Sequence, residues 1–393
     1  MPSFKLGSIL FIALVSAWPA IQALPSAAMA GGAPTGVNLS SGSTRASFAI
    51  PPSNVASTGA VLDAYHVVYG VAVPRMHRPT CVSCGDTPFT NFHIQMFVRR
   101  LTYSPGGIQV SRQRPLFTGP RGEQIAVFAL RRHWLVYLAY SQRQSWQLLA
   151  RNVVTGRRIL LDTSRREALP SLSAHAGTDG RTVVWQTWTT IQGKPASVIR
   201  SYSLITGKRH LLLSGGNGNP SSIGDPQISG NRMAFVQENY NQTSEIMLQN
   251  IRTGRVRSLT PANQVNYEPA ISGNVLVWVH GRLSNGHTHG LVVADLATGR
   301  RVALPYSSSQ LPQVANGRYV AFSTDKQHVS VQLYDARTGR RRVLAGPAVA
   351  GRPGSPVGNL AAGPRAILYY VLNPCSHPMT CASHIVVTRM PRA

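Results

Sequence analysis

Five Thr-Gly dipeptides, each followed by a basic residue, recur along the chain at intervals of 40 to 51 residues. Each follows a stretch with the alternating apolar pattern of a strand and precedes a second, shorter stretch of that kind. The dipeptide is therefore predicted to be a hairpin turn between two antiparallel strands. The five are Thr155-Gly156, Thr206-Gly207, Thr253-Gly254, Thr298-Gly299 and Thr338-Gly339.

A second turn signal lies upstream of each of the last four dipeptides. It combines Gly with Asn or Asp, the residues that best tolerate the positive φ angles of tight hairpins. The turns are Asp179-Gly180, Gly230-Asn231, Gly273-Asn274 and Asn316-Gly317, and apolar strands are expected after them at Thr182 to Trp188, Arg232 to Gln237, Val275 to His280 and Tyr319 to Ser323. Each unit is thus predicted to hold four antiparallel strands.

Four short strands repeated every 40 to 50 residues are typical of a β-propeller blade. A β-sandwich also has many short strands, but it does not repeat the same two turns five times. A divergent first blade is expected at residues 65–117, and a last blade at 366–389 lacks its outer strand. Arg45 to Ile50 has the alternation to supply that strand and close the circle. The all-β fold is predicted to have seven blades, or six if the divergent first unit is not a blade.

The repeat resembles that of the TolB-like propeller family. The resemblance is carried by Pro226-Gln-Ile-Ser-Gly-Asn and Pro269-Ala-Ile-Ser-Gly-Asn, together with the downstream Thr-Gly, and covers roughly residues 123–344. It implies a propeller. Similar repeats form the non-catalytic propeller of prolyl peptidases and the whole fold of some acidic-polysaccharide lyases, so the resemblance implies no single activity.

The N-terminus has the pattern of a secretory signal peptide. Lys5 precedes an apolar run from Leu6 to Trp18, and small residues follow up to Ala30. The expected organisation is a signal peptide at 1–30, a flexible segment at 31–44 and a single propeller at 45–393. No later run is long enough to span a membrane. The protein is therefore predicted to be exported, either secreted or periplasmic. It is also expected to be a monomer.

The chain is strongly basic, with 39 Lys and Arg against 13 Asp and Glu and a net charge of +26. Such a protein is attracted to polyanions. Nucleic acid is not the expected partner, because no zinc-finger, homeodomain or RRM signature accompanies the charge. If the Thr-Gly turns share one face, their basic residues form a ring: Arg157, Arg158, Lys208, Arg209, Arg255, Arg257, Arg300, Arg301, Arg340, Arg341 and Arg342.

Motifs of catalysis are absent from the sequence. There is no Gly-x-Ser-x-Gly elbow, P-loop, dinucleotide fingerprint or His-Glu-x-x-His. Asp225 and Glu268 precede the prolines of consecutive repeats and are expected in loops at the mouth of the central channel, where they are candidate ligand contacts. His287 and His289 are further candidates in a loop of the second of these repeats. No catalytic residue, cofactor or metal ion is assigned.

The four cysteines fall in the first and last blades, between the second and third strands. Cys81 with Cys84, and Cys375 with Cys381, are predicted to form local disulfides that secure the seam of the circle, since an exported chain meets an oxidising compartment. The competing interpretation is a zinc site completed by nearby histidines.

Two functions remain open. The absence of motifs favours a non-catalytic binding or scaffold module for a protein or an anionic envelope polymer. The alternative is a polysaccharide lyase or hydrolase that acts on an acidic polymer at the channel mouth. A cluster of His, Arg and Asp or Glu at that mouth would favour the enzyme.

Overall fold

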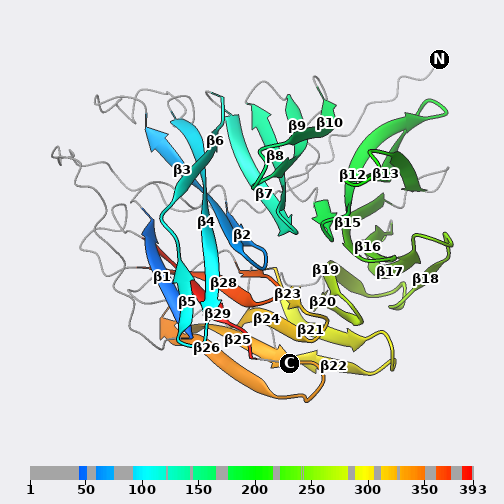
Figure 1. Ribbon diagram of the computed structural model, residues 1–393. Coiled ribbons are helices and arrows are strands. Elements are labelled where there is room, and N and C mark those ends of the chain that lie inside the picture. Colours follow the sequence, from blue (N-terminus) through cyan, green and yellow to red (C-terminus); the bar gives the residue numbers. More distant parts are fainter. Residues whose placement is uncertain are drawn as a thin grey trace, which may run out of the picture.

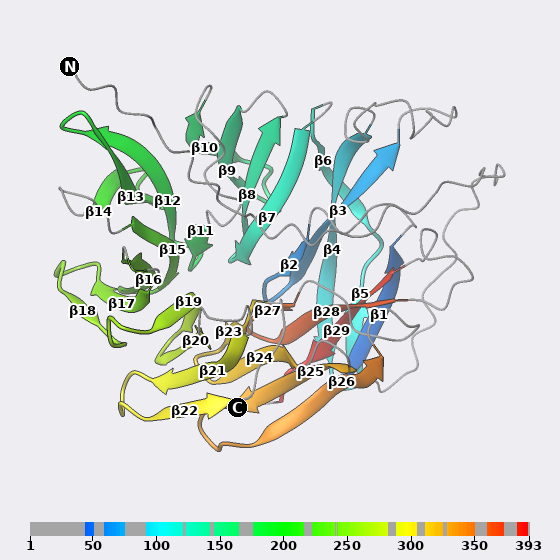
Figure 2. The same ribbon diagram turned by 180° about the vertical axis from the view of Figure 1, so that it is seen from behind.

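The structure is a computed structural model that describes residues 44–50, 59–74, 92–120, 123–141, 145–164, 176–215, 222–239, 241, 243–281, 288–304, 311–324, 328–349, 360–372 and 383–391. The regular elements of these residues are all strands, which form seven separate sheets. The sheets are arranged around a central axis as the blades of a propeller (Figure 1, and from behind in Figure 2). The predicted all-β fold with seven blades is confirmed. The expected signal peptide, residues 1–30, and nearly all of segment 31–44 lie outside the described residues.

The blades are numbered 1 to 7 in chain order. Six of them hold four strands from the axis outward, and blade 1 holds five because its outer position is shared by two strands. The inner strands are β2 (Ala60–Leu62), β7 (Glu123–Arg131), β11 (Ala176–Thr178), β15 (Ser222–Ser229), β19 (Val265–Ser272), β23 (Gln313–Ala315) and β27 (Ala361–Ala362). The second strands are β3 (His66–Pro74), β8 (Trp134–Ser141), β12 (Thr182–Ile191), β16 (Arg232–Glu238), β20 (Val275–Gly281), β24 (Tyr319–Thr324) and β28 (Ala366–Leu372).

The third strands are β4 (Phe92–Ser104), β9 (Trp146–Asn152), β13 (Lys194–Ser203), β17 (Ser244–Asn250), β21 (Thr288–Asp295), β25 (His328–Asp335) and β29 (Ser383–Arg389). The outer strands are β5 (Gly107–Val110) with β6 (Arg114–Thr118), then β10 (Arg158–Ser164), β14 (Arg209–Ser214), β18 (Val256–Ser258), β22 (Arg301–Leu304), β26 (Arg341–Val349) and, in blade 7, β1 (Arg45–Ile50). The four strands predicted after the tight turns are β12, β16, β20 and β24, each in the second position of its own sheet.

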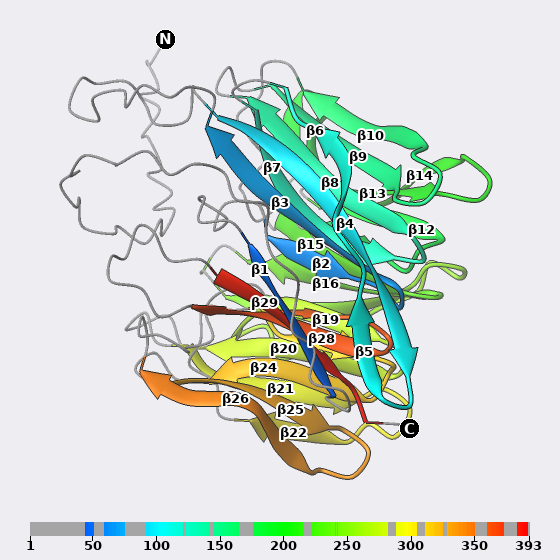
Figure 3. The same ribbon diagram turned by 60° about the vertical axis from the view of Figure 1, so that its left-hand side comes forward.

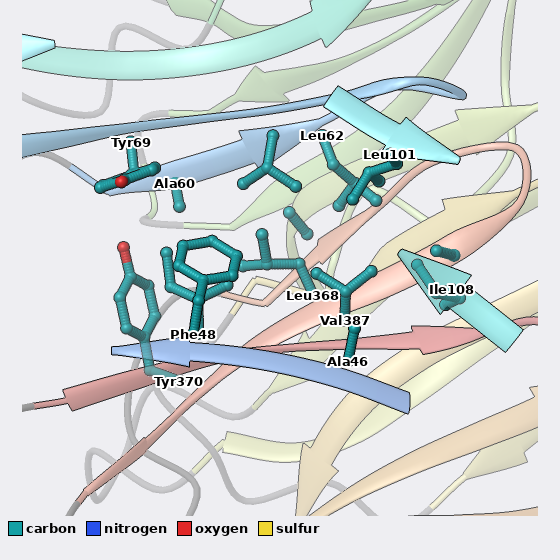
Figure 4. Packing of buried hydrophobic residues seen from close by; sticks show 14 of the residues in the cluster. Ala46, Phe48, Ala60, Leu62, Tyr69, Leu101, Ile108, Leu368, Tyr370 and Val387 are labelled. Atoms are coloured by element: carbon teal, nitrogen blue, oxygen red, sulfur yellow. The ribbon is translucent and has the colours of Figure 1, made fainter. Parts of the chain in front are cut away.

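The chain ends meet in blade 7. Strand β1 pairs antiparallel with β29, from Arg45 opposite Thr388 to Ile50 opposite Ser383. Phe48 of β1 is 1% exposed and packs with Tyr69 of blade 1, while Leu368 and Val387 of blade 7 face the same cluster (Figure 4). The predicted closure by the N-terminal strand is confirmed, and the alternative of six blades is wrong.

Blade 1 differs from the prediction in its outer strand. One strand was expected at Gly107 to Phe117, but β5 pairs with the end of β4 and β6 pairs with its middle, with a break between them. The side chain of Arg99 on β4 reaches into that break and donates to the carbonyl of Ser111 at 3.0 Å. Arg99 thus occupies the place where the outer strand leaves the ladder.

The Thr-Gly turns share one set of hydrogen bonds. In blade 4, the side-chain oxygen of Asn250 accepts from the backbone N–H of Arg252 and Thr253, and the Thr253 hydroxyl accepts from the N–H of Arg255. Gly254 between them has φ +72°. Asn152, Asp295 and Asp335 hold the position of Asn250 in other blades. The repeat therefore begins three residues before Thr-Gly, with a side chain that closes the turn locally.

The turns that join inner to second strands lie on one face of the propeller. Hydrogen bonds join these turns to the turns of neighbouring blades. The N–H of His133 donates to Asp63 at 2.9 Å, and the N–H of Gly317 donates to the Ser272 hydroxyl at 3.1 Å. In an antiparallel blade, the turns from third to outer strand lie at the same end. We call this the turn face; its hairpins β4–β5 and β13–β14 project to the right in Figure 3.

Aromatic residues of the second strands pack between the blades. Trp185, Phe235, Trp278 and Phe322 are at most 2% exposed. Trp188 of β12, in contrast, is 44% exposed. It lies near the end of β12 that is opposite the turn face, where this strand continues to Ile191, three residues beyond the predicted strand.

Candidate functional site

A cavity of about 400 Å³ runs along the axis of the propeller. It is lined by residues from the inner strands of all seven blades, from Val61 in blade 1 to Ala361 in blade 7. The polar side chains of these strands therefore converge here, although they are far apart in the sequence.

Asp225 and Glu268 both line this cavity. Their predicted position, in loops before the inner strands, is wrong: they lie inside β15 and β19, at irregularities of the strand pairing. Their φ angles are 50° and 55°, the left-handed region that non-glycine residues rarely adopt. Such bulges on an inner, edge strand accommodate the following proline, which has no N–H to donate. Two acidic residues in equivalent positions of consecutive blades thus line the channel.

The mouth of the cavity at the turn face is basic. Arg131 ends β7, Arg132 follows it, and Arg181 lies in the corresponding turn of blade 3. Arg132 and Arg181 are exposed, whereas Arg131 donates to the carbonyls of Leu62 at 3.3 Å and Leu130 at 3.2 Å. Burial lowers the pKa of Arg131, and the nearby charge of Asp63 opposes that effect.

Beside this mouth, Asp63, His66 and His133 bring their ligand atoms together. The Asp63 side chain is 2% exposed, and its carboxylate accepts from the N–H of Tyr65 at 2.7 Å, of His66 at 2.8 Å and of His133 at 2.9 Å. Burial by itself would raise the pKa of Asp63, but the interactions with His66 and these backbone donors outweigh it and lower the pKa. The carboxylate is therefore held as an anion between two blades.

The two imidazoles face each other and the carboxylate. His66 Nδ1 lies 3.3 Å from His133 Nδ1, and they lie 3.4 and 3.5 Å from the two Asp63 oxygens. These groups are close enough to share a metal ion or to move a proton between them. Among the described residues, this is the one set of three or more His, Cys, Asp or Glu side chains so arranged.

Aromatic and cationic groups surround this cluster. The Tyr65 ring stacks on His133, with 6.2 Å between ring centroids, and Arg365 of blade 7 lies 5.2 Å from the Tyr65 ring. Arg365 also lies over Tyr103, whose pKa is raised by burial. The mouth therefore combines an anion, two imidazoles, two phenols and guanidinium groups.

None of the three cluster residues was predicted from the sequence as a functional residue. Asp63 and His66 belong to the divergent blade 1, and His133 to blade 2, so no repeat or spacing links them. One signal was available: Asp63 stands directly after an apolar strand and three residues before His66, the spacing of a turn closed by an aspartate side chain.

The other predicted residues are placed as follows. All eleven members of the basic ring are exposed, in or beside the Thr-Gly turns on the turn face. His289 lies in β21, and His287 lies outside the described residues. The four cysteines also lie outside them, so both the disulfide and the zinc interpretations stay predictions. No helix of the described residues is long and apolar enough to cross a membrane.

The chain is a seven-bladed β-propeller whose circle is closed by the N-terminal strand β1. The propeller itself is what the TolB-like resemblance implied. No protein-family model and no curated protein matches the chain. Among solved structures, it is similar to an acylaminoacyl peptidase from Pyrococcus horikoshii, with 10% identity and a TM-score of 0.53, over 83% of this chain and 50% of that one. This similarity shows the fold alone.

Two further solved structures are similar at lower scores. TolB from Acinetobacter baumannii has 16% identity and a TM-score of 0.44, over 71% of this chain. The match spans 63% of the TolB chain, less than two thirds of its length. An oligogalacturonate lyase in complex with manganese has 12% identity and a TM-score of 0.48, over 88% of this chain and 98% of that one.

Proposed function

We propose that this protein is an exported, non-catalytic binding module that holds an anionic polymer of the cell envelope on its turn face. The observation that carries the proposal is the placement of eleven exposed basic residues in five turns at one end of the blades. Arg132 and Arg181, at the channel mouth, lie at that same end. A polyanion that crosses the face meets cations at the rim and at the centre.

Among the described residues, few carboxylates lie near these cations; Glu123 lies near Arg158, and Asp295 lies near Arg300. Asp295 and Asp335 lie in the same turns, but their oxygens accept from the turn backbone, and Asp335 also pairs with Arg318 at 2.7 Å. The acids of the channel, Asp225 and Glu268, line the cavity and belong to inner strands. They suit a cation or a cationic group that enters the channel, and they oppose the entry of the polymer itself.

The experiment is a titration of the protein with fluorescent polygalacturonate at a series of NaCl concentrations. Binding through exposed ion pairs weakens steeply as salt rises, because the charges are screened and counterions are released. We expect the affinity to fall at least tenfold between 50 and 200 mM salt, and the quadruple variant R255Q/R257Q/R300Q/R301Q to bind more weakly with a smaller salt dependence. Affinity that is constant across salt, or unchanged in the variant, would contradict the proposal. Neutral dextran is the control polymer.

A second function is favoured by one observation, the convergence of Asp63, His66, His133 and Arg131 near the channel mouth. These groups are the kinds that a lyase or hydrolase of an acidic polymer uses to neutralise a carboxylate and to move a proton. Depolymerisation of polygalacturonate by the wild-type protein, lost in His133→Gln, would establish this function in place of the first.

A further inference from the structure

We infer that Asp63, His66 and His133 form a binding site for a divalent transition-metal ion of the zinc class. The inference is independent of polymer binding, since it rests on the three side chains alone. They come from two neighbouring blades: Asp63 and His66 flank the turn between β2 and β3, and His133 lies in the turn between β7 and β8. An ion here would join blade 1 to blade 2 at the turn face.

The two imidazole nitrogens are spaced like two ligands of a tetrahedral ion, and each lies near one oxygen of Asp63. The two Nδ1 atoms are 3.3 Å apart, and they lie 3.4 and 3.5 Å from the carboxylate oxygens that they face. Ligands about 2.0–2.1 Å from a zinc ion are about 3.3–3.4 Å apart in a tetrahedron, but only about 3.0 Å apart at the adjacent corners of an octahedron. The two nitrogens thus match a tetrahedral pair, and one Asp63 oxygen lies within 4.8 Å of both and completes the set after a small movement of the side chains.

A proton is a poorer explanation of this geometry than a cation. Two imidazole nitrogens that face each other can share one proton, and that proton serves only one of the three contacts among the groups. A cation placed between the three groups satisfies both lone pairs and the carboxylate together. Imidazole nitrogen with one carboxylate is also a donor set that zinc and similar ions accept.

The ligands are held in place before any ion binds. The Asp63 carboxylate is fixed by backbone N–H groups of Tyr65, His66 and His133, so the same residues that offer imidazoles also orient the carboxylate. The Tyr65 ring stacks on the His133 imidazole and limits its rotation. The His66 side chain is 13% exposed and that of His133 is 39% exposed, which leaves a fourth position open on the solvent side. A water molecule or an anionic ligand group fits that position.

The experiment is a titration of chelator-treated full-length protein with Co²⁺ and with Zn²⁺, followed by visible absorption and by calorimetry. We expect His66→Gln and His133→Gln to lose one equivalent of ion, or to bind it at least tenfold more weakly. His210→Gln is the matched control, because His210 is an exposed histidine on β14 far from the cluster in sequence and outside it. The difference between variants isolates this site from other histidines and from the cysteines.

The inference is overturned if both cluster variants bind the same number of ions with the same affinity as the control. Thermal unfolding followed by circular dichroism verifies that each variant is folded. If His66→Gln fails to fold, the more exposed His133→Gln decides the outcome. A rise in unfolding temperature with Zn²⁺ that disappears in His133→Gln gives the same answer by a second route, since an ion that binds only the folded state stabilises it.

Discussion

The carboxylate of Asp63 in blade 1 accepts a hydrogen bond of 2.9 Å from the backbone N–H of His133 in blade 2. The same carboxylate also closes its own turn by accepting from Tyr65 and His66. One side chain therefore fixes the turn of its own blade and its contact with the next blade.

Asp63→Ala removes the buried carboxylate that accepts from the backbone N–H groups of Tyr65, His66 and His133. We expect the free energy of unfolding to fall by about 3 kcal/mol, because each lost hydrogen bond to a charged group costs about 1.5–3 kcal/mol and water replaces part of them. The matched control is Asp179→Ala, since Asp179 accepts from Arg181 and Thr182 at 2.8 Å each in a more exposed turn of blade 3. Urea unfolding that shows equal losses for the two variants would refute the role of Asp63 between blades.

The charge of Asp335 makes the free energy of unfolding depend on pH in the acid range. Hydrogen bonds from Arg318, at 3.0 and 2.7 Å, lower the pKa of Asp335 to about 2 against the opposing effect of burial. A carboxyl with a lowered pKa in the folded state stabilises the protein above its unfolded pKa of about 3.9, and this contribution is lost as the pH falls towards 2.

The variant Asp335→Asn tests this effect without breaking the turn, because Asn152 and Asn250 hold the same position in blades 2 and 4. We expect it to be less stable than the wild type at pH 6 and equal to it near pH 2. Thermal unfolding at each pH measures the difference. A difference that persists unchanged at pH 2 would show that the charge of Asp335 is not its source.

Phe48 tests the closure of the propeller. It is 1% exposed, its ring centroid lies 5.5 Å from that of Tyr69, and the Arg99 guanidinium lies 4.4 Å from its ring. Replacing a buried Phe by Ala costs about 3–5 kcal/mol. We expect Phe48→Ala to lower the midpoint of global unfolding as much as Phe322→Ala in blade 6. If β1 were a separable appendage, Phe48→Ala would leave that midpoint in place.

Local turn chemistry made most of the fold predictable. Thr-Gly and the Gly-Asn or Asp-Gly pairs define where a strand must reverse, and the alternation at Arg45 to Ile50 was enough to predict the closing strand. Asp225 was misplaced for a physical reason: a proline normally ends or begins a strand, but Pro226 is accommodated within the inner edge strand by a bulge. Only the hydrogen-bond pattern reveals that arrangement.

The Asp63 cluster could not be predicted in the same way. Its members meet because blades 1 and 2 pack side by side, and the contact depends on the rotation between two sheets rather than on any sequence spacing. The basic ring, in contrast, follows from the repeat itself, since every blade that carries Thr-Gly places the next residue at the same end.

Two lysines of the same blade distinguish binding of the polymer at the turn face from binding at the opposite end. Lys208 lies in the turn before β14 on the turn face, and Lys194 begins β13 at the opposite end of the blade; both are exposed. The charge reversals K208E and K194E are compared for affinity towards fluorescent polygalacturonate at 50 mM NaCl. We expect K208E to weaken binding several-fold and K194E to leave it within twofold of the wild type. Equal losses in the two variants, or a loss confined to K194E, would contradict binding at the turn face.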